Sequence, residues 1–253
     1  MMLVTGAGSG LGRYLHENLG GHGLTRANAG ETIERFKRSG ADMIVHAAFN
    51  AAREVDRGSL KAYLRDNVLL TEDLVGIPHK KFIFISTVDV YPKDGRAHAE
   101  DEEIDVISAE GLYAVTKLMS EAIVRRRGQG HLIIRASALL GGYSRRNSII
   151  KIVEDSEPEL TLSGDSRLNY VLHSDLLKFI EFAAASGIKG IYNAASCGAI
   201  TLKEAAALAG KKVKFGRHEY DCGDISNNRI AALFPAFQKT SADVVREFIK
   251  ERE

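Results

Sequence analysis

The chain opens on a short apolar segment that runs straight into a glycine-rich turn. Residues 2–4 are Met, Leu and Val, residues 5–12 read TGAGSGLG, and apolar residues at helical spacing follow over residues 13–19. Glycines allow a tight turn and a close approach of the backbone to phosphate, and the free N–H groups at a helix N-terminus attract anions. A flexible surface turn is the alternative. The position between a strand and a helix instead favours dinucleotide binding by Gly6, Gly8, Ser9, Gly10, Leu11 and Gly12.

Short apolar runs bounded by turn residues recur along the chain, over residues 2–4, 42–45, 82–85, 131–134 and 190–193. Runs that are apolar on both faces are typical of strands in a buried parallel sheet. Longer amphipathic segments lie between them, for example residues 60–74, 112–127, 175–185 and 201–209. This alternation predicts an α/β protein with a Rossmann-type doubly wound parallel sheet.

The strand and helix pattern loosens in two places, which suggests a second, smaller part of the molecule. Residues 141–168 begin with GGYSRRN and continue as a charged segment, and the chain after residue 195 becomes helical and polar. No interdomain linker separates these pieces from the rest. We therefore expect an NAD(P)-binding Rossmann domain made of residues 1–140 and 171–195, with a small substrate-binding lobe made of residues 141–170 and 196–253.

Composition narrows the classes of partner. The 34 Lys and Arg residues nearly balance the 33 Asp and Glu residues, so the net charge of +1 offers no broad positive field for nucleic acid. Neither Cys197 nor Cys222 belongs to a CxxC pair or a His cluster, which predicts no metal site and no disulfide framework. No targeting segment and no apolar run of membrane length is present. A cytoplasmic protein without nucleic-acid or membrane partners is expected.

The residue that would hold the adenosine ribose is missing from its usual place. An acidic residue is expected about 20 residues after the glycine turn, but the second short apolar segment reads HGLTR and ends on Arg26. A guanidinium can bind the 2′-phosphate of NADP in a bidentate fashion, although an ordinary solvated arginine is the alternative. NAD(P) is the predicted cofactor, with NADP slightly favoured. Residues 12–43 are also a short stretch for two strands and two helices, so one strand–helix unit is expected to be pared away.

A tyrosine and a lysine stand four residues apart at the start of a predicted helix. Tyr113 and Lys117 then lie on one helix face. The ordinary pKa of a tyrosine side chain is about 10, so a nearby ammonium and a cationic nicotinamide are needed to make it a useful acid or base at neutral pH. Thr87, at the end of the apolar segment 82–85, could bind the same substrate oxygen, because ligand chemistry belongs at the carboxyl ends of such strands. An amphipathic surface pair is the alternative for an isolated match.

Taken together, these residues resemble the extended short-chain dehydrogenase/reductase family, also called the NAD-dependent epimerase/dehydratase family. The resemblance covers nearly the whole chain. Its landmarks are the turn of residues 5–12, HAA at residues 46–48, Asn67, ISTVDVY at residues 85–91, YAVTK at residues 113–117 with Glu121, RAS at residues 135–137, and GIYNA at residues 190–194.

The resemblance implies roles for individual residues. Those expected to line the cofactor cleft are Ala47, Ala48, Asn67, Ser86 and Ser137. Lys117 is implied to bind the nicotinamide ribose, and Thr87 and Tyr113 to hold the reacting oxygen. The helices that carry Tyr113 and Lys117 often pair in this family, which implies a possible homodimer.

Two departures from the family pattern bear on the substrate. Dehydratases of the family carry an Asp-Glu pair after the catalytic threonine, whereas Val88 and Asp89 stand here, so a dehydratase is disfavoured. The arginine segment of many nucleotide-sugar enzymes is out of register. Arg145, Arg146 and Asn147 lie in the predicted lobe and are candidate substrate ligands for a diphosphate, with a solvated loop as the alternative.

The sequence therefore predicts an NAD(P)-dependent oxidoreductase or epimerase that acts at a carbinol or ketone carbon of a sugar nucleotide or a related small molecule. Tyr113, Lys117 and Thr87 are its predicted catalytic set. A non-catalytic dinucleotide sensor of Rossmann architecture is the competing interpretation, because this fold hosts many functions. Such a sensor would have little reason to keep all three catalytic side chains.

Overall fold

A six-stranded sheet organises the computed structural model, which describes residues 1–52 and 54–252. Its order is β10-β6-β4-β3-β1-β2, and parallel pairing joins β1 to both β2 and β3, and β3 to β4. The strands are β1 (Met2–Thr5), β2 (His22–Leu24), β3 (Ala41–His46), β4 (His79–Thr87), β6 (Leu132–Ala136) and β10 (Gly190–Ala194). The predicted α/β class with a Rossmann-type sheet is confirmed.

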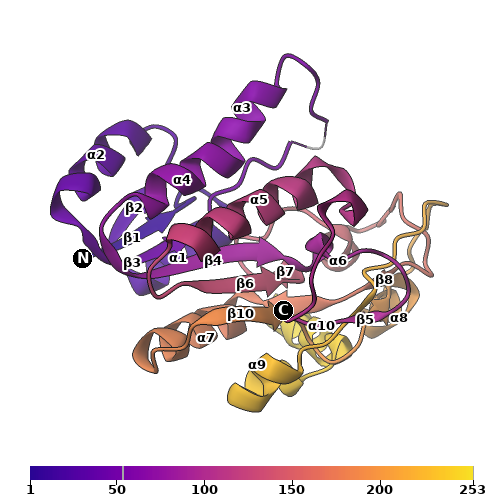
Figure 1. Cartoon of the computed structure of the whole chain (residues 1–253). Helices are drawn as coiled ribbons and strands as arrows, with labels where there is room; N and C mark the ends of the chain where they lie inside the picture. The colour runs from indigo at the N-terminus through magenta and orange to yellow at the C-terminus, as the bar shows by residue number, and fades with distance from the viewer. Residues whose placement is uncertain (53, 253) are drawn as a thin grey trace. The chain divides into compact units, whose positions relative to one another are not determined.

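Helices alternate with these strands along the chain (Figure 1). They are α1 (Gly10–Leu19), α2 (Ala29–Ser39), α3 (Leu60–Leu64), α4 (Leu70–Val75), α5 (Gly111–Arg127) and α7 (His173–Ala185). The predicted amphipathic segment 60–74 is one continuous helical stretch, because a π-helical turn, η1 (Arg65–Leu69), joins α3 to α4. Helix α5 packs against β4 and against both η1 and α4. The helix with Tyr113 and Lys117 is thus held between the sheet and a neighbouring helix.

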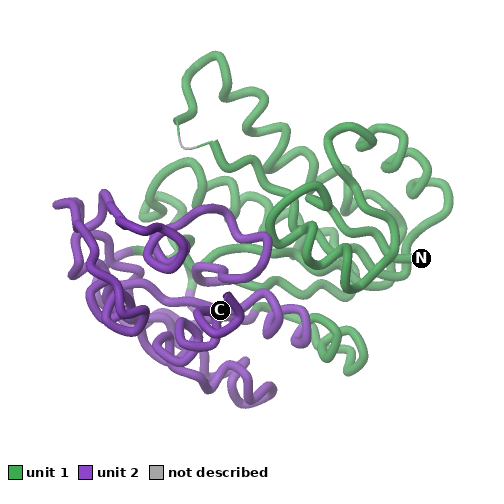
Figure 2. The backbone as a smooth tube through the Cα atoms, turned by 180° about the vertical axis from the view of Figure 1, so that it is seen from behind, with its two compact units in different colours: residues 1–92, 103–135, 180–191 green, residues 93–102, 136–179, 192–253 purple. Residues whose placement is uncertain are grey.

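The chain divides into two compact units (Figure 2). Unit 1 comprises residues 1–92, 103–135 and 180–191. Its core gathers apolar side chains from the strands and from the helices that cover them, including Leu3, Phe36, Leu74, Phe82 and Ile133. Two short 3-10 turns, η2 (Val88–Val90) and η3 (Val106–Ser108), also belong to this unit.

Unit 2 comprises residues 93–102, 136–179 and 192–253 and has a core of its own. Its short strands pair as β7 (Ala138–Leu140) with β9 (Tyr170–Leu172), β8 (Arg167–Leu168) with β11 (Ile200–Thr201), and β5 (Ala97–His98) with β12 (Asp224–Ile225). Its remaining elements are α6 (Ser148–Glu154), α8 (Leu202–Leu208), α9 (Asn228–Leu233), η4 (Pro235–Gln238) and α10 (Ser241–Lys250). Capping boxes begin α8 at Thr201 and α10 at Thr240. The predicted domain boundaries, and a substrate-binding role for residues 141–170 and 196–253, stay predictions.

The expectation that one strand–helix unit is pared away after the glycine turn is wrong. Residues 12–43 contain most of α1, all of β2 and α2, and the start of β3. The segment is short for two reasons. Strand β2 has only three residues, and two glycines with positive φ, Gly20 and Gly40, end α1 and α2 without further loop residues. Within the described residues, no helix is long and apolar enough to cross a membrane.

Candidate active site

The glycine turn connects β1 to α1 and is packed against the loop after β3. Gly6 has φ +74°, and a Cβ there would come within 3.0 Å of the Ala48 backbone. Gly12 is tighter still, because its Cβ would lie 2.4 Å from the Gly6 carbonyl oxygen. Gly10 also has positive φ, at 57°. Side chains are therefore disfavoured at Gly6, Gly10 and Gly12, so the backbone itself forms the surface of the turn at these positions.

The start of α1 is open to an anion. Ser9 precedes the helix with an extended backbone, and among the described residues its side chain makes no capping hydrogen bond. The first turn of α1 carries no acidic residue, and Gly8 and Ser9 are exposed. Free N–H groups and the positive end of the helix dipole favour a phosphate at such a place. The turn thus fits the pyrophosphate of a dinucleotide.

Behind the turn, a buried chain of hydrogen bonds crosses the sheet. The Ala48 N–H donates to Thr5 Oγ1 over 3.0 Å, Thr5 Oγ1 lies 2.7 Å from His46 Nδ1, and His46 Nε2 lies 3.0 Å from Thr71 Oγ1. Burial, helped by the charge of Lys117, lowers the pKa of His46 to about 3. A neutral imidazole with its proton on Nε2 satisfies every group in this chain. His46 therefore joins the glycine turn to the helix layer.

Lys117 lies buried in the middle of α5 with its charge against aromatic faces. Its Nζ donates to the Ile85 carbonyl over 2.8 Å and lies 4.8 Å and 5.1 Å from the ring centroids of Phe84 and Phe49. Burial lowers the pKa of Lys117 to about 7, and the carboxylate of Glu121 opposes that shift. The lysine is thus held between its charged and neutral forms near neutral pH.

Tyr113 and Thr87 each lie close in the chain or in space to a residue that contacts Lys117. The Tyr113 ring is half-buried, and its centroid lies 4.6 Å from that of Phe49, so Tyr113 and Lys117 flank one aromatic ring. Thr87 ends β4 two residues after Ile85, whose carbonyl binds Lys117. The Thr87 hydroxyl accepts a hydrogen bond from the Asp89 N–H over 3.1 Å and lies 3.2 Å from an Asp89 carboxylate oxygen.

A buried ion pair stands one helical turn beyond Lys117. Arg135 Nη2 donates to Glu121 Oε2 over 2.7 Å, and both side chains are 3% exposed. Ser86 Oγ donates to Glu121 Oε1 over 2.5 Å, and Arg135 Nη1 donates to the Tyr91 hydroxyl over 2.8 Å. Ser86, predicted to line the cofactor cleft, thus has its hydroxyl engaged by Glu121. The pair fixes the strand end that carries Thr87.

Asn67, a second polar residue predicted to line the cleft, holds the loop after β3. It lies in the π-turn η1, and its Oδ1 accepts the Asn50 N–H over 2.7 Å while its Nδ2 donates to the Asn50 carbonyl over 3.3 Å. The Asn67 carbonyl accepts a hydrogen bond from Ser120 Oγ of α5 over 2.8 Å. Ala47 and Ala48 are half-buried at the start of the same loop. π-turns are frequent at functional sites.

Arg26 follows β2, and its side chain is 77% exposed. Its Nη2 donates to Asp66 Oδ2 over 2.6 Å, and the same oxygen accepts a hydrogen bond from Asn50 Nδ2 over 2.9 Å. The guanidinium thus already has a carboxylate partner, with which a 2′-phosphate would have to compete.

The remaining predicted site residues belong to unit 2. Ser137 is buried, and its hydroxyl has no hydrogen-bond partner among the described residues. Arg145 is exposed, Arg146 forms an ion pair with Asp155, and Asn147 caps α6 by accepting the Ile150 N–H over 3.1 Å. No cluster of three His, Cys, Asp or Glu side chains suited to a metal ion occurs in residues 1–52 or 54–252.

Sequence reasoning missed two features of this site. Phe49 follows the HAA segment directly, but nothing in its residue type indicated that it would contact both Tyr113 and Lys117. The Glu121–Arg135 pair was visible only as two separate landmarks. The spacing of Lys117 and Glu121, four residues on one helix, was the available signal for a shared electrostatic role.

The six-stranded parallel sheet with a glycine turn after its first strand defines the class of Rossmann-type proteins. More particularly, the chain belongs to the NAD dependent epimerase/dehydratase family, whose sequence pattern matches residues 2–195. The expected family is therefore confirmed. No curated protein sequence matches the chain significantly.

Solved structures share the fold over the full length of the chain. A dTDP-4-dehydrorhamnose reductase from Clostridium acetobutylicum has a TM-score of 0.81 at 18% identity, covering 99% of this chain and 99% of that one. The Bacillus anthracis dTDP-4-dehydrorhamnose reductase in complex with NADP also scores 0.81 at 18% identity, covering 100% and 99%. A UDP-glucuronic acid 4-epimerase from Bacillus cereus with UDP-glucuronic acid and NAD scores 0.75 at 18% identity, covering 100% and 99%. At these identities the likeness shows the fold alone.

Proposed function

We propose that this protein is an NAD(P)-dependent oxidoreductase or epimerase that acts at a carbinol or ketone carbon of a sugar nucleotide. Family membership supports an enzyme of this kind, and the structurally similar proteins are named for dTDP-linked and UDP-linked sugars. The observation that carries the proposal is the placement of Lys117, a buried ammonium that shares an aromatic neighbour with Tyr113. A buried charge that burial opposes is costly and is characteristic of functional sites.

The glycine turn and the start of α1 would hold the pyrophosphate of the dinucleotide, and Lys117 its nicotinamide ribose. When bound, the nicotinamide would supply or accept the hydride. The chain's own residues bind and orient the two molecules and move the proton. The Ser137 hydroxyl, buried and without a partner among the described residues, is a further group that a ligand could satisfy.

Tyr113 is the proposed proton carrier, and its hydroxyl would give a proton to the substrate oxygen in reduction and take it back in oxidation. The charge of Lys117 favours the phenolate form electrostatically, which makes the exchange possible near neutral pH. Thr87 would orient the same substrate oxygen by a hydrogen bond. Val88 and Asp89 do not form the acidic pair expected for elimination of water, so a dehydratase is disfavoured.

The direct test is Tyr113→Phe, which keeps the ring and its packing on Phe49 but removes the hydroxyl. Folding and dinucleotide binding should survive, while single-turnover hydride transfer, followed by nicotinamide absorbance at saturating cofactor, should fall about 10²- to 10⁴-fold. Candidate substrates are dTDP-linked and UDP-linked 4-keto sugars and their alcohols. Transfer at nearly the wild-type rate would refute the mechanism. A wild-type protein that binds dinucleotide and turns over none of them would favour the sensor.

For the cofactor, we propose that NADPH binds at least as tightly as NADH, because Arg26 stands where an acidic residue is usual. The Asp66 carboxylate competes for the same guanidinium. Titration of both cofactors by fluorescence should show that Arg26→Ala weakens NADPH and leaves NADH unchanged. Asp66→Asn should have the opposite effect on NADPH. A strong NADH preference that neither variant changes would reject this role for Arg26.

For the substrate, we propose that Arg145 or Arg146 binds its diphosphate. Replacement by alanine should then raise KM by the equivalent of a lost charged hydrogen bond, about 1.5 to 3 kcal/mol, with cofactor affinity unchanged. Arg146 would have to leave Asp155, so Arg145, which is exposed, is the first residue to test. Equal KM values for the alanine variants and the wild type would reject the contact.

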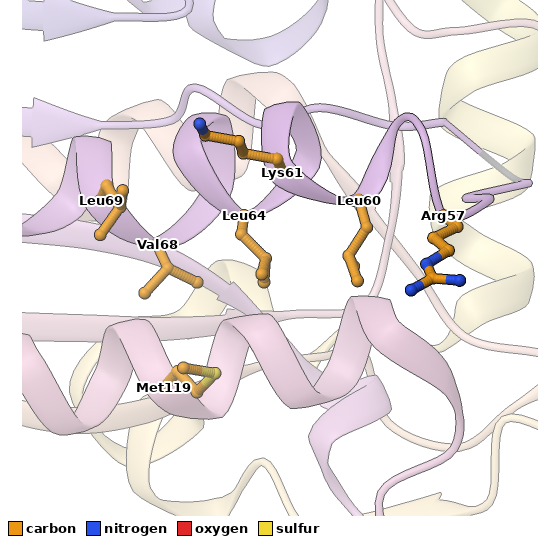
Figure 3. A pocket seen from close by; sticks show the side chains of 7 residues that line it. All are labelled: Arg57, Leu60, Lys61, Leu64, Val68, Leu69 and Met119. Carbon is orange, nitrogen blue, oxygen red and sulfur yellow. The ribbon is translucent and has the colours of Figure 1, made fainter.

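We also infer a homodimer formed by the outer helices of unit 1. An apolar groove runs between the helical stretch of residues 60–75 and α5, and Leu60, Leu64 and Val68 point across it toward α5, which carries Met119 (Figure 3). Leu69 and Met119 are 46% and 45% exposed. A second copy paired through α5, as the family resemblance implies, would cover this surface.

Light scattering coupled to gel filtration tests the homodimer with Met119→Lys, which should yield a monomer. Ile107→Lys, at a 92% exposed apolar residue outside the groove, is the matched control and should leave the dimer intact. A monomeric wild type would contradict the inference. We also propose a cytoplasmic location, because Cys197 and Cys222 are free thiols, as is usual in a reducing compartment.

A further inference from the structure

Phe49 lies against both groups of the proposed proton-transfer machinery. Its ring centroid is 4.6 Å from that of Tyr113, with an angle of 56° between the ring planes, and 5.1 Å from Lys117 Nζ. On a third side, the Tyr63 ring meets it edge-on at 6.3 Å and 82°. Phe49 is itself only half-buried. A half-buried aromatic ring that contacts two functional side chains is a candidate part of the site.

The backbone next to Phe49 is clamped by a buried amide. Asn67 accepts the Asn50 N–H with Oδ1 and donates to the Asn50 carbonyl with Nδ2, so both ends of its side chain bind one residue of the loop. Asn67 is 6% exposed and is held in the π-turn, where its carbonyl accepts the Ser120 hydroxyl of α5. The clamp therefore ties the loop that carries Phe49 to the helix that carries Tyr113 and Lys117.

We propose that Phe49 is a further active-site residue, which orients the Tyr113 ring and stabilises the charged form of Lys117, and that Asn67 is a positioning residue acting through Phe49. This inference rests on the proposed function of Tyr113 and Lys117.

The physical basis is the charge distribution of the aromatic ring. The face of Phe49 carries negative potential and attracts the Lys117 ammonium, as does the face of Phe84 on another side. Attraction to these ring faces favours the charged form of Lys117 and so offsets part of the lowering of its pKa that burial causes. The other charged or titratable groups that interact with the lysine are Glu121, which raises its pKa, and His46, whose pKa the lysine lowers. Replacing Phe49 leaves both of these side chains in the protein, whereas Tyr113 loses its aromatic contact.

Phe49→Leu removes the ring and keeps an apolar side chain, so it separates the electrostatic effect from packing. The pKa of Lys117 can be followed without turnover, by NMR titration of protein with ¹³C-labelled lysine, with the signal assigned through Lys117→Arg. We expect the pKa to fall by about 0.5 to 1 pH unit, which corresponds to the usual strength of a cation–π interaction. Asn67→Leu should shift it in the same direction by releasing the loop.

The matched control is Phe36→Leu, the same substitution at a ring buried in the core of unit 1 among residues of β1, β3 and α2. It should lower stability without moving the pKa of Lys117. An unchanged or raised pKa in Phe49→Leu, with the control behaving as described, would overturn the electrostatic role. A shift of equal size in Phe36→Leu would do so as well, because the effect would then be a general loosening of unit 1.

Hydride transfer separates this inference from the proposed function. At pH 7 and saturating dinucleotide, Phe49→Leu should transfer hydride about 3- to 10-fold more slowly than the wild type. Raising the pH should not restore the rate, because the Lys117 ammonium loses its proton at a lower pH in this variant. If the Tyr113→Phe variant is inactive while the separate Phe49→Leu variant keeps the wild-type rate and pH profile, only the role of Phe49 is rejected. An active Tyr113→Phe would reject the proposed function, and the lysine titration would still test the contact between Phe49 and Lys117.

Discussion

The two units differ in how completely their buried polar side chains are hydrogen-bonded. In unit 1 they bond to one another in continuous networks, one running from Thr5 through His46 to Thr71 and one joining Ser86, Glu121 and Arg135. Unit 2 has networks too, such as Asn169 with Ser196. It also buries the hydroxyls of Ser137 and Tyr170, which have no partner among the described residues.

The difference bears on where rigidity is needed. A buried hydroxyl without a partner costs about 1 to 3 kcal/mol, whereas a satisfied network holds its members in one arrangement. Unit 1 therefore has its proposed proton-transfer groups positioned by the fold itself. Unit 2 leaves hydrogen-bonding capacity unused, which is the condition expected of groups that a ligand completes.

The largest effect on this contrast should come from Glu121→Gln. The substitution keeps the shape of the side chain but leaves the Arg135 guanidinium buried without its carboxylate. Breaking a buried ion pair in this way costs about 3 to 5 kcal/mol, measured as the free energy of unfolding in urea. Glu72→Gln in the exposed Arg127–Glu72 pair is the control and should cost less than about 1 kcal/mol. Equal losses in the two variants would show that the buried network does not hold unit 1 together.

A second prediction concerns acid, which should act on one histidine in each unit. Burial lowers the pKa of His46 in unit 1 to about 3 and that of His173 in unit 2 to about 4. Below about pH 6.5 the unfolded chain takes up protons that the folded histidines refuse, so stability falls by about 1.4 kcal/mol per pH unit for each group. Each histidine should therefore cost about 2 kcal/mol between pH 7 and pH 5.

Urea unfolding at both pH values checks this with His46→Gln and His173→Gln. Each variant should lose its share of the difference between pH 7 and pH 5, whatever its stability at pH 7. A pH dependence unchanged by both substitutions would mean that the two imidazoles are protonated in the folded protein.

A smaller change in stability at pH 7, in this case a gain, is expected for Lys117→Met. The folded protein disfavours the ammonium, whose pKa falls from 10.5 to about 7, so the unfolded chain binds the extra proton between those values. The wild type should become more stable as pH rises from 7 toward 10.5, and Lys117→Met should abolish that rise and gain about 1 to 2 kcal/mol at pH 7. Lys80→Met, at an 82% exposed lysine, should change neither quantity. A less stable Lys117→Met would mean that the ammonium contributes to folding.

The smallest effects test the unused hydroxyls of unit 2. Ser137→Ala and Tyr170→Phe each remove a buried oxygen without a partner among the described residues, so each should leave stability unchanged or raise it by up to about 1 kcal/mol. If the Ser137 hydroxyl serves the dinucleotide, Ser137→Ala should also weaken cofactor binding while Tyr170→Phe does not. A destabilised Ser137→Ala would remove the contrast between the units at that position.

Much of the fold was predictable because local chemistry and tertiary structure agree. The glycine turn, the apolar strands and the helix of Tyr113 and Lys117 each follow from short-range patterns, and all lie where those patterns indicate. The start of α1 and the continuity of residues 60–75 follow from the same periodicity. The π-turn η1 within that stretch could not be predicted, because the spacing of apolar residues along a helix is too irregular to reveal one extra residue in a single turn.

The candidate site was only partly within reach of the sequence. The residue types for proton transfer could be named, since a Tyr and a Lys four apart share a helix face. Long-range partners could not, because Phe49 and Tyr113, or Asn50 and Asn67, meet only after the sheet and the helix layer have formed. Ser86 and Asn67 illustrate the same limit, since each was expected to face the cofactor and each has its side chain engaged by a neighbouring protein group.

The π-turn η1 links the position of Asn67, on the inner side of the helical stretch, to that of the apolar side chains that line the outer groove. One additional residue in a helical turn rotates everything beyond it by about 100° around the helix axis. Deleting a single residue from η1 would therefore re-phase α3 against α4, moving the inner amide of Asn67 and the outer side chains of Leu60 and Leu64 together. Insertions and deletions in this helix should be tolerated far less than substitutions. The groove can therefore be altered by substitutions, which keep each residue at its place around the helix axis, but not by changes in the length of the helix.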